Sequence, residues 1–518
     1  MREELFLVID CGTQSVRAII FDTKGSLIDK VKIEIEPYFS NYPGYAEQHA
    51  DIYWEKLCEA CKSLKEKQAG IWNRIIGVSI TTLRDTGINI DAHGNPLRPA
   101  IIWLDQRMAK CSKSLPLKDN MMFSAIGMNR AVEITRKKSK ANWIKENQPK
   151  LWKKTCKYML LSGYLTFKLT GCMVDSIANQ IGHIPFDYKN KCWPEHESNY
   201  RYSVFGVERE KLPELVSPGA TIGKISMEVS NLTGINEGTA VIASGSDKGC
   251  ETLGVGCVDT SSASLSFGTT ATVQTTSHKY FEPLKFLPAY PSLIPDCYNP
   301  EVEIFRGYWM ISWFKKEFGT REMLEASEKN IPPEVLLNER LNEVPPGSYG
   351  LILQPFWGPG LKMPEAKGAI IGFGDVHTRA HIYRAIIEGI NYALLDGVEK
   401  IEKKSSTHVE RIMVSGGGSQ SDGICQITAD MFNRPVYRGQ TYETSGLGAA
   451  INGFVGTGIY NSYQEAVKNM VHHCHIFEPD KANSEIYRKL YERVYKRIYP
   501  KLSSLYTEIQ QILNYPEF

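Results

Sequence analysis

The sequence predicts an α/β protein of two domains, because it contains two similar strand-turn-strand motifs and is long for one core. The first motif is LFLVIDCGTQSVRAIIFD, residues 5–22, and the second is SLSFGTTATVQ, residues 264–274. In each, an apolar strand leads through Gly-Thr and a polar tip into a second apolar strand. A chain of 518 residues exceeds what a single hydrophobic core usually supports. The repeated motif therefore indicates a duplicated domain.

The boundary between the two domains is expected at residue 243. A short strand, residues 239–243, opens there into the small-residue segment SGSDKG, and the second motif follows. We therefore expect an N-terminal domain, residues 1–243, and a C-terminal domain, residues 244–518.

Composition and charge argue against several functional classes. The net charge of +2 produces no large field that would attract nucleic acid or an anionic membrane. No apolar run has membrane-spanning length, and the apolar segment near the N-terminus is too short for a signal-peptide core. We expect a cytoplasmic protein that binds neither nucleic acid nor a membrane.

The cysteines are interpreted as free thiols, because twelve in so long a chain are too sparse for a disulfide scaffold. Cys58 and Cys61 lie in the helical pattern WEKLCEACKSL, and no second CxxC completes a zinc site. We interpret them as part of one helix face. The His472–His475 segment, HHCH, could bind a metal ion, and the sequence leaves that question open.

The tip of the first motif has the residues of a phosphate site. Gly12 allows close approach of a backbone N–H, while Thr13 and Ser15 add hydroxyl donors. Arg17 adds a positive charge, and the carboxylate of Asp10 suits Mg²⁺ with its waters. The alternative is a plain hairpin turn, because Asp and Gly are ordinary turn residues.

Three carboxylates follow other predicted strands. The strand 75–80 leads to Arg84 and Asp85, and the strand 100–104 runs into Asp105. Asp247 lies among small residues after the strand 239–243, where a substrate hydroxyl could reach it. Open α/β sheets bind ligands at the carboxyl ends of their strands. The alternative is that these are surface ion pairs, which contribute little to stability.

A glycine turn in the second half is a candidate nucleotide site. The strand 412–414 leads through SGGGSQS, residues 415–421, into a predicted helix over 422–433. The amino terminus of a helix after such a turn can bind an anion or pack against adenosine. The turn is neither a P-loop nor a GxGxxG motif.

Over nearly its whole length the chain resembles the FGGY family of carbohydrate kinases. The matching segments are DCGTQSVRA, LRPAIIWLDQR, SGYLTFKLTG followed by Val174-Asp175, GTAVIASGSDKG, SLSFGTT, KGAIIGFGDVHTRAHIYRAIIEG, SGGGSQSDGICQITADMFNRPV and ETSGLGAAI. The paired hairpins resemble those of the wider actin, Hsp70 and sugar-kinase superfamily, in which two ribonuclease-H-like domains enclose ATP in a central cleft.

The resemblance implies an enzyme that transfers phosphate from ATP to an alcohol group, with Mg²⁺ as cofactor. It implies that Asp247 is the general base and that Asp10 and Asp247 lie at the metal. The implied ATP-binding residues are Gly12, Thr13, Gln14, Arg17, Gly268, Thr269, Thr270, Gly417, Gly418 and Ser421. The implied substrate-binding residues are Arg84, Asp85, Trp103, Asp105 and Asp247.

The substrate is the least determined feature. Arg84-Asp85 resembles the Arg-Glu pair of glycerol kinases and of the autoinducer-2 kinase, whereas Thr135 stands where glycerol kinases have an aromatic residue. Carboxylates and an arginine suit adjacent hydroxyls, so we expect a neutral sugar or polyol of about four to six carbons. A glycerol or autoinducer-2-type kinase is one alternative. An actin- or Hsp70-like ATP-driven switch without a small substrate is another, and a homodimer stays open.

Overall fold

The computed structural model describes residues 4–358, 363 and 365–513, which form two compact units. Unit 1 contains the chain up to Gly256, together with Ala289–Asn299 and Glu443–Val471. Unit 2 contains Cys257–Pro288, Pro300–Tyr442 and the chain from His472 onward. The chain thus passes between the units several times, whereas the sequence suggested one boundary at residue 243. The physical reason is that a late helix of the chain covers the sheet of unit 1.

Unit 1 is built on a six-stranded sheet in the order β11-β12-β5-β1-β2-β3. Strand β1 pairs antiparallel with β2 and parallel with β5, so the predicted first hairpin is confirmed. Every residue of β1 is buried, which explains its nearly continuous apolar sequence. The strands of this sheet are β1 (Leu5–Cys11), β2 (Ser15–Asp22), β3 (Leu27–Glu34), β5 (Ile75–Thr82), β11 (Thr221–Lys224) and β12 (Ala240–Ile242).

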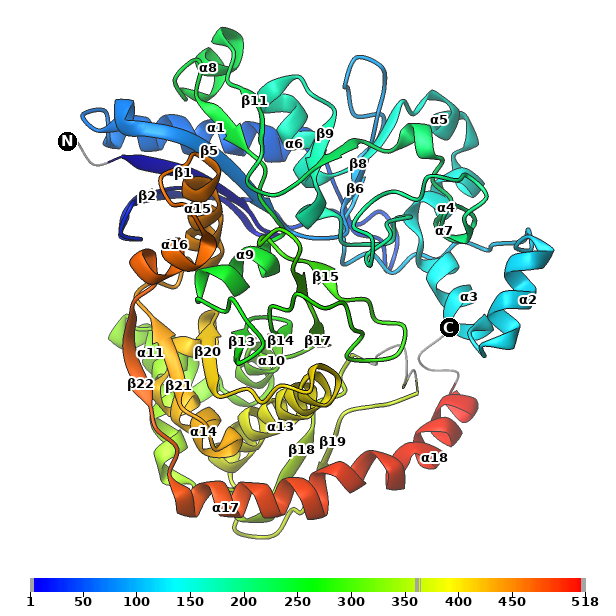
Figure 1. Cartoon of the computed structure of the whole chain (residues 1–518). Helices are drawn as coiled ribbons and strands as arrows, with labels where there is room; N and C mark the ends of the chain where they lie inside the picture. The colour runs from blue at the N-terminus through cyan, green and yellow to red at the C-terminus, as the bar shows by residue number, and fades with distance from the viewer. Residues whose placement is uncertain (1–3, 359–362, 364, 514–518) are drawn as a thin grey trace. The chain divides into compact units, whose positions relative to one another are not determined.

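Helices cover both faces of this sheet. Alternate β1 residues such as Leu7 pack with Tyr53 of α1 (Ala50–Lys67) in one core cluster. On the opposite face, the Phe6 ring lies 5.5 Å from that of Phe454 in α15 (Thr444–Gly456). Figure 1 shows α15 and α16 (Tyr463–Met470), in orange, beside the blue strands β1 and β2, although more than half of the sequence separates them.

The remaining elements of unit 1 form smaller layers. A four-stranded sheet has the order β4-β7-β6-β8, and β9 pairs with β10 and β15 with β16. The strands are β4 (Glu47–Gln48), β6 (Gly87–Ile90), β7 (Ala100–Ile101), β8 (Lys157–Leu160), β9 (Val174–Ser176), β10 (Glu214–Val216), β15 (Tyr290–Pro291) and β16 (Tyr298–Asn299). The helices are α2 (Leu117–Ala125), α3 (Asn129–Lys138), α4 (Lys140–Asn147), α5 (Pro149–Lys154), α6 (Leu161–Thr170), α7 (Tyr200–Phe205), α8 (Met227–Thr233) and α9 (Asp247–Gly254).

Unit 2 repeats the topology of the unit 1 sheet, in the order β17-β14-β13-β20-β21-β22. Strand β13 pairs antiparallel with β14 and parallel with β20, as β1 does with β2 and β5. The second hairpin and the predicted duplication are therefore confirmed. The strands are β13 (Ser262–Phe267), β14 (Ala271–Gln274), β17 (Glu301–Ile304), β20 (Arg411–Ser415), β21 (Val436–Gly439) and β22 (His473–Phe477).

Helix α13 (Arg379–Ser405) is the central helix of unit 2. Thr378 caps its first turn, and most of its residues are buried against β14, β17 and the β18-β19 pair. Figure 1 shows α13 in yellow beside the strands of this unit. The other elements are α10 (Trp309–Phe318), α11 (Thr320–Lys329), α12 (Pro333–Glu339), β18 (Ile352–Gln354), β19 (Ala369–Ile371), α14 (Asp422–Phe432), α17 (Lys481–Leu490) and α18 (Lys496–Leu513).

Among the described residues, no helix combines the length and the apolar character needed to cross a bilayer.

Helices α9 and α15 approach each other closely through glycines. A Cβ atom on Gly448 would overlap the backbone carbonyl of Cys250, and one on Gly254 would overlap that of Thr444. We predict that Gly448→Ala lowers the free energy of unfolding by about 2 kcal/mol or more, in line with overpacked cores. Thermal or urea unfolding measures this loss.

Gly70→Ala is the matched control, because nothing lies within 4 Å of a Cβ atom built there. It should change the unfolding midpoint very little. Equal stability of the two variants would mean that the two helices can separate without cost.

Candidate active site

The predicted phosphate tip of unit 1 is a tight turn with a tryptophan against it. The Gly12 N–H donates to the Ser15 carbonyl at 3.0 Å. The Trp103 Nε1–H donates to Thr13 Oγ1 at 3.0 Å, which brings a predicted substrate residue to the tip. The Gln14 side chain is exposed. The tip is therefore fixed by its own backbone and by one indole ring.

Arg17 is shared between two carboxylates. It lies opposite Asp10 in the β1-β2 register, and its Nη1 is 3.0 Å from Asp10 Oδ2 and 3.3 Å from a Glu443 oxygen. Lys30 also binds Glu443, at 2.6 Å. Sequence analysis did not identify Glu443, because 426 residues separate it from Arg17. The only signal was its position at the start of the ETSGLGAAI segment.

Asp10 is a buried carboxyl group with a strongly perturbed pKa. Burial raises its pKa from 3.8 to about 6, against the lowering effect of Arg17. The negative charges of Asp247 and Glu443 raise it further. The electrostatic coupling shows that Asp10 and Asp247 lie near each other, so unit 1 gathers negative charge that a cation would stabilise.

Asp247 is the first residue of α9, directly after the N-cap residue Ser246. Its Oδ1 atom accepts a hydrogen bond from the Lys248 N–H at 2.8 Å and lies 3.8 Å from Arg84 Nε. Arg84 Nε also donates to Ser246 Oγ at 3.3 Å. The Asp247 side chain is 33% exposed. Desolvation by the surrounding protein raises its pKa, and the charges of Arg84 and Lys248 oppose that rise.

Asp85 faces two basic side chains that sequence analysis missed. Lys140 Nζ and His183 Nδ1 each lie 2.9 Å from Asp85 Oδ2, and the His183 N–H donates to Oδ1 at 2.9 Å. Burial raises the pKa of Asp85, but Lys140 and His183 outweigh it and lower the pKa below its ordinary value. Asp85 has a left-handed backbone, φ 48°, and a Cβ atom on neighbouring Gly182 would press against its side chain. Lys140 and His183 come from distant segments that carry no local signal.

Asp105 belongs to a buried ion network instead of facing solvent. Its oxygens accept hydrogen bonds from Arg107 Nε at 2.8 Å, Arg107 Nη2 at 2.7 Å and the Ala46 N–H at 2.6 Å. Glu47 also binds Arg107, whose guanidinium lies 3.8 Å from the centre of the Tyr45 ring. The Asp105 side chain is 1% exposed. It can therefore reach a substrate only by breaking this network.

The strand expected before Asp105 is also shorter than predicted. Only Ala100–Ile101 form β7, which pairs with β4 and β6 outside the main sheet. The predicted strand 100–104 is therefore too long, and Asp105 does not directly follow a strand end. The reason is that Arg107, two positions after Asp105, folds back onto it.

The tip of the second hairpin fixes the start of α10 in unit 2. The Gly268 carbonyl accepts from the Tyr308 N–H at 3.1 Å, and the Thr269 carbonyl accepts from the Trp309 N–H at 3.3 Å. Thr270 Oγ1 donates to the Phe305 carbonyl at 3.2 Å. The Thr269 side chain is exposed at the tip.

The glycine turn lies beside this tip. Gly416 has φ +79°, and a Cβ atom there would be 2.9 Å from the Phe267 carbonyl carbon. A Cβ atom on Gly418 would lie 2.7 Å from the Tyr308 ring, so the ring packs directly on the turn. Nothing lies within 4 Å of a Cβ atom on Gly417. Ser421 ends the turn and caps α14 by accepting from Ile424 N–H at 3.3 Å.

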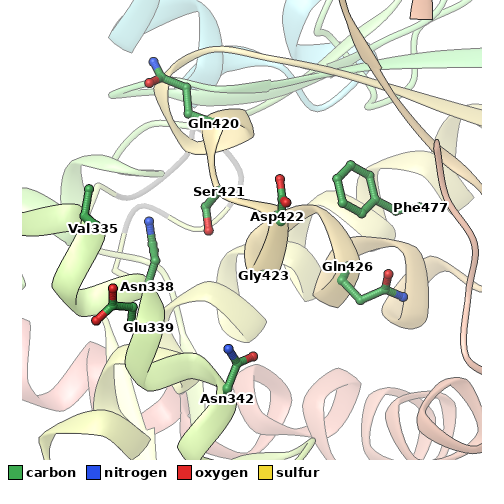
Figure 2. Close-up of a pocket in the computed structure, with 10 residues that line it drawn as sticks. All are labelled: Val335, Asn338, Glu339, Asn342, Gln420, Ser421, Asp422, Gly423, Gln426 and Phe477. Carbon is green, nitrogen blue, oxygen red and sulfur yellow. The ribbon is translucent and has the colours of Figure 1, made fainter. Parts of the chain in front are cut away.

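A cavity of about 510 Å³ opens at the amino end of α14, within the usual size range of ligand pockets. Figure 2 shows residues of α12 and the turn after it on one side and the start of α14 on the other. The Asn338 carboxamide oxygen accepts from the Tyr383 hydroxyl at 2.8 Å, which fixes its orientation. The lining residues are Val335, Asn338, Glu339, Asn342, Gln420, Ser421, Asp422, Gly423, Gln426 and Phe477.

The remaining metal candidates do not form a cluster. Cys58 and Cys61 lie on α1, as predicted, and both are free thiols. His473–Phe477 form the exposed strand β22, whose successive side chains point to opposite faces. Within the described part of the chain, no three His, Cys, Asp or Glu side chains are grouped to hold a metal ion.

The raised pKa of Asp10 predicts a pH-dependent cost of folding. A carboxyl group whose folded pKa is about 6, against 3.8, favours the folded state most when it is protonated, so stability falls as pH rises through this window. Asn cannot ionise. The melting temperature of Asp10→Asn should therefore exceed that of the parent by an amount that is near zero at about pH 4 and grows up to about pH 7.

Thermal melting of both proteins across this range measures the difference. Asp396→Asn, on α13, is the matched control for the loss of a carboxylate. A difference between Asp10→Asn and the parent that is constant with pH would contradict the assignment.

Comparison with known proteins agrees with the geometry. The N-terminal domain of the FGGY family of carbohydrate kinases matches residues 5–254, and its C-terminal domain matches residues 263–457. An uncharacterized sugar kinase of Escherichia coli, YgcE, is 30% identical over 94% of this chain and 92% of its own length. A gluconokinase of Bacillus licheniformis is 26% identical over 98% of both chains.

A solved ligand-bound xylulose kinase from Lactobacillus acidophilus has the same fold, with a TM-score of 0.82 and 21% identity over 98% of this chain and 100% of its own. This likeness confirms the predicted α/β class with its two domains. Together, the two domain matches and the relatives show an ATP-dependent phosphotransferase with an alcohol acceptor. The chain belongs to the FGGY family of carbohydrate kinases.

Proposed function

We propose that the enzyme transfers the γ-phosphate of ATP to a hydroxyl of a neutral sugar or polyol, with Asp247 as the general base. The observation that carries this proposal is the setting of Asp247. It is a partly exposed carboxylate at the start of a helix, with Arg84 beside it and a raised pKa. A general base works best when its pKa approaches the operating pH. Membership of a kinase family sets aside a switch protein without a substrate.

The proposed proton transfer is direct. The substrate hydroxyl loses its proton to an Asp247 oxygen as its own oxygen attacks the γ-phosphorus, and ADP leaves. Arg84 favours the ionised form of Asp247, because the two charges attract. Phosphoryl transfer requires mainly positioning and charge stabilisation, so one base and well-placed donors are sufficient.

Asp10 and Asp247 are the proposed residues for Mg²⁺. Their mutual electrostatic coupling and the raised pKa of the buried Asp10 fit a divalent cation, since positive charge would relieve both. Mg²⁺ supplies neutralisation of phosphate charge. In this arrangement Arg17 is not a free cation, because Asp10 and Glu443 both bind it.

The nucleotide is assigned to three segments. We propose that the backbone of Gly12 and Thr13 and the tip Gly268–Thr270 bind phosphate groups. Gly417, Gly418 and Ser421 would bind the adenosine part, because the turn leads directly to the cavity of about 510 Å³ at α14. The unobstructed face of Gly417 leaves room for close approach of a ribose.

A neutral substrate fits the charge balance of unit 1. Asp85 pairs with Lys140 and Asp105 with Arg107, so both carboxylates have a compensating cation. Arg84 and Asp247 also balance each other. A substrate rich in hydroxyls adds no charge to this arrangement. Arg84 and Trp103 are the proposed contacts of the substrate. Asp85 would act mainly by holding His183 in position.

Two further proposals follow from the chain as a whole. All twelve cysteines are free thiols, which is typical of a reducing compartment, and we assign the enzyme to the cytoplasm. Thr135, whose hydroxyl bonds the Ala131 carbonyl at 2.9 Å, is smaller than an aromatic ring. It leaves room for a substrate longer than glycerol.

Asp247→Asn should abolish transfer while ATP binding stays nearly intact. The amide preserves shape but cannot accept the proton, and general-base catalysis is typically worth about 10²- to 10⁴-fold. Coupled turnover and nucleotide titration measure the two quantities separately. Asp396→Asn, the same change on α13, should have parental activity. Turnover of Asp247→Asn within a few-fold of the parent would remove Asp247 from this role.

The substrate is tested by an ATP-coupled screen of neutral polyols, aldoses and ketoses. Xylulose, gluconate, glycerol and the autoinducer-2 precursor belong in the same screen. We expect a neutral compound of about four to six carbons to have the highest kcat/KM, and Arg84→Ala to lower that value. A best substrate that carries a carboxylate would overturn the charge argument. Glycerol as best substrate would overturn the argument from Thr135.

A further inference from the structure

The segment from Asp175 to His183 lies against two residues of the candidate active site. The Ser246 N–H donates to the Ala178 carbonyl at 3.3 Å, and the Asp85 N–H donates to the Ile181 carbonyl at 3.1 Å. Asn179 lies between these two backbone contacts. Asn179 therefore belongs to the short segment that contacts both Asp85 and Ser246, the residue before the proposed base.

Asn179 also lies next to a third part of the site. The short 3₁₀ turn Ile177–Asn179 packs against β15 (Tyr290–Pro291). The Tyr290 ring centre is 5.1 Å from the Arg84 guanidinium. Ser246, Asp85 and strand β15 thus contact the segment that carries Asn179.

A buried carboxylate fixes the orientation of Asn179. Asp175 Oδ1 accepts from Asn179 Nδ2 at 2.9 Å, and Asp175 Oδ2 accepts from Ser162 Oγ at 2.7 Å and Gln180 Nε2 at 2.8 Å. Asp175 is completely buried. Because the amide nitrogen of Asn179 faces this anchor, its amide oxygen faces away from it.

That oxygen is buried without a hydrogen-bond partner in the described part of the chain. Asn179 as a whole is only 6% exposed. A buried acceptor without a donor is costly, and in native proteins such groups usually have a role or a partner outside the protein chain. A donor at this position would stabilise the folded enzyme.

We propose that Asn179 is a substrate-binding residue whose Oδ1 accepts a hydrogen bond from a substrate hydroxyl other than the one that is phosphorylated. This inference rests on the proposed function, because it requires a sugar or polyol beside Asp247. It also restricts the substrate. A carboxylate or a fully ionised phosphate cannot donate, so neither group occupies this position. The residue would thus select a hydroxyl at one carbon of the chain.

The competing explanation is that Asn179 only holds its segment through Asp175. Ser162→Ala distinguishes the structural explanation from the proposal. It removes another hydrogen bond to the same Asp175 and leaves the Asn179 oxygen unchanged. Asn179→Ser is a second variant of smaller perturbation, in case Asn179→Ala fails to fold. Melting temperatures of all variants show which proteins are folded at the assay temperature.

The experiment measures kcat and KM of the parent and the three variants on the best substrate and on its single-deoxy analogues. We expect Asn179→Ala and Asn179→Ser to raise the substrate KM about 3- to 10-fold, as for one neutral hydrogen bond. The KM for ATP and the kcat should stay within about twofold. On one deoxy analogue the variants and the parent should have equal KM values. That analogue lacks the donor hydroxyl, so the bond is already lost and the substitution removes nothing more. Ser162→Ala should leave every KM near the parental value.

Two results overturn the proposal and are distinguishable. If the parent is active but the Asn179 variants lose the same factor on every analogue, or match Ser162→Ala, Asn179 is structural and the proposed function stands. If no sugar or polyol stimulates ATP turnover by the parent, the proposed function fails and the assignment of Asn179 fails with it.

Discussion

The close contact of α9 with α15 is the constraint on which the candidate active site depends. Gly254 and Gly448 allow the two helices to approach within backbone contact. Helix α9 carries Asp247 at its first position, and Glu443 immediately precedes α15. The proposed base and the carboxylate that shares Arg17 are therefore placed by one helix pair. Because α15 also covers β1, the same packing supports the strand that ends at Asp10.

Charge pairing determines which carboxylates of unit 1 are available for chemistry. Asp85 is held by Lys140 and His183, and Asp105 is enclosed by Arg107. The pKa values of Asp10 and Asp247 are raised, because the effect of burial outweighs the attraction of Arg17 and Arg84. Burying an ionised carboxylate costs less folding free energy when cations and hydrogen-bond donors surround it. A buried carboxylate with weaker compensation lowers the stability of the folded state. The carboxyl groups of unit 1 with a raised pKa include the completely buried Asp175 and the two proposed for metal binding and proton transfer.

The sequence predicted local features well and distant pairings poorly. The hairpins at residues 5–22 and 264–274 were predicted because their apolar strands and polar tips are contiguous. Glu443, Lys140 and His183 were missed because each meets its partner through the tertiary fold. For Asp105 the sequence left an ion pair as the alternative to substrate binding, and Asp105 does pair with Arg107, two positions later, although inside the protein and not on its surface. The orientation of Asn179 needed the position of Asp175 and its other donors.

The contact of Tyr308 with two loops has a consequence for how this enzyme could change. Its backbone N–H bonds the Gly268 carbonyl, and its ring packs on Gly418, beside the cavity at α14. In the proposed assignment, the turn that would bind adenosine and the tip that would bind phosphate groups therefore both contact Tyr308. A lineage that altered the glycine turn to accept another nucleoside triphosphate would then also disturb the tip of the second hairpin. Selection for a new phosphate donor would therefore require compensating changes in α10 before catalysis recovered.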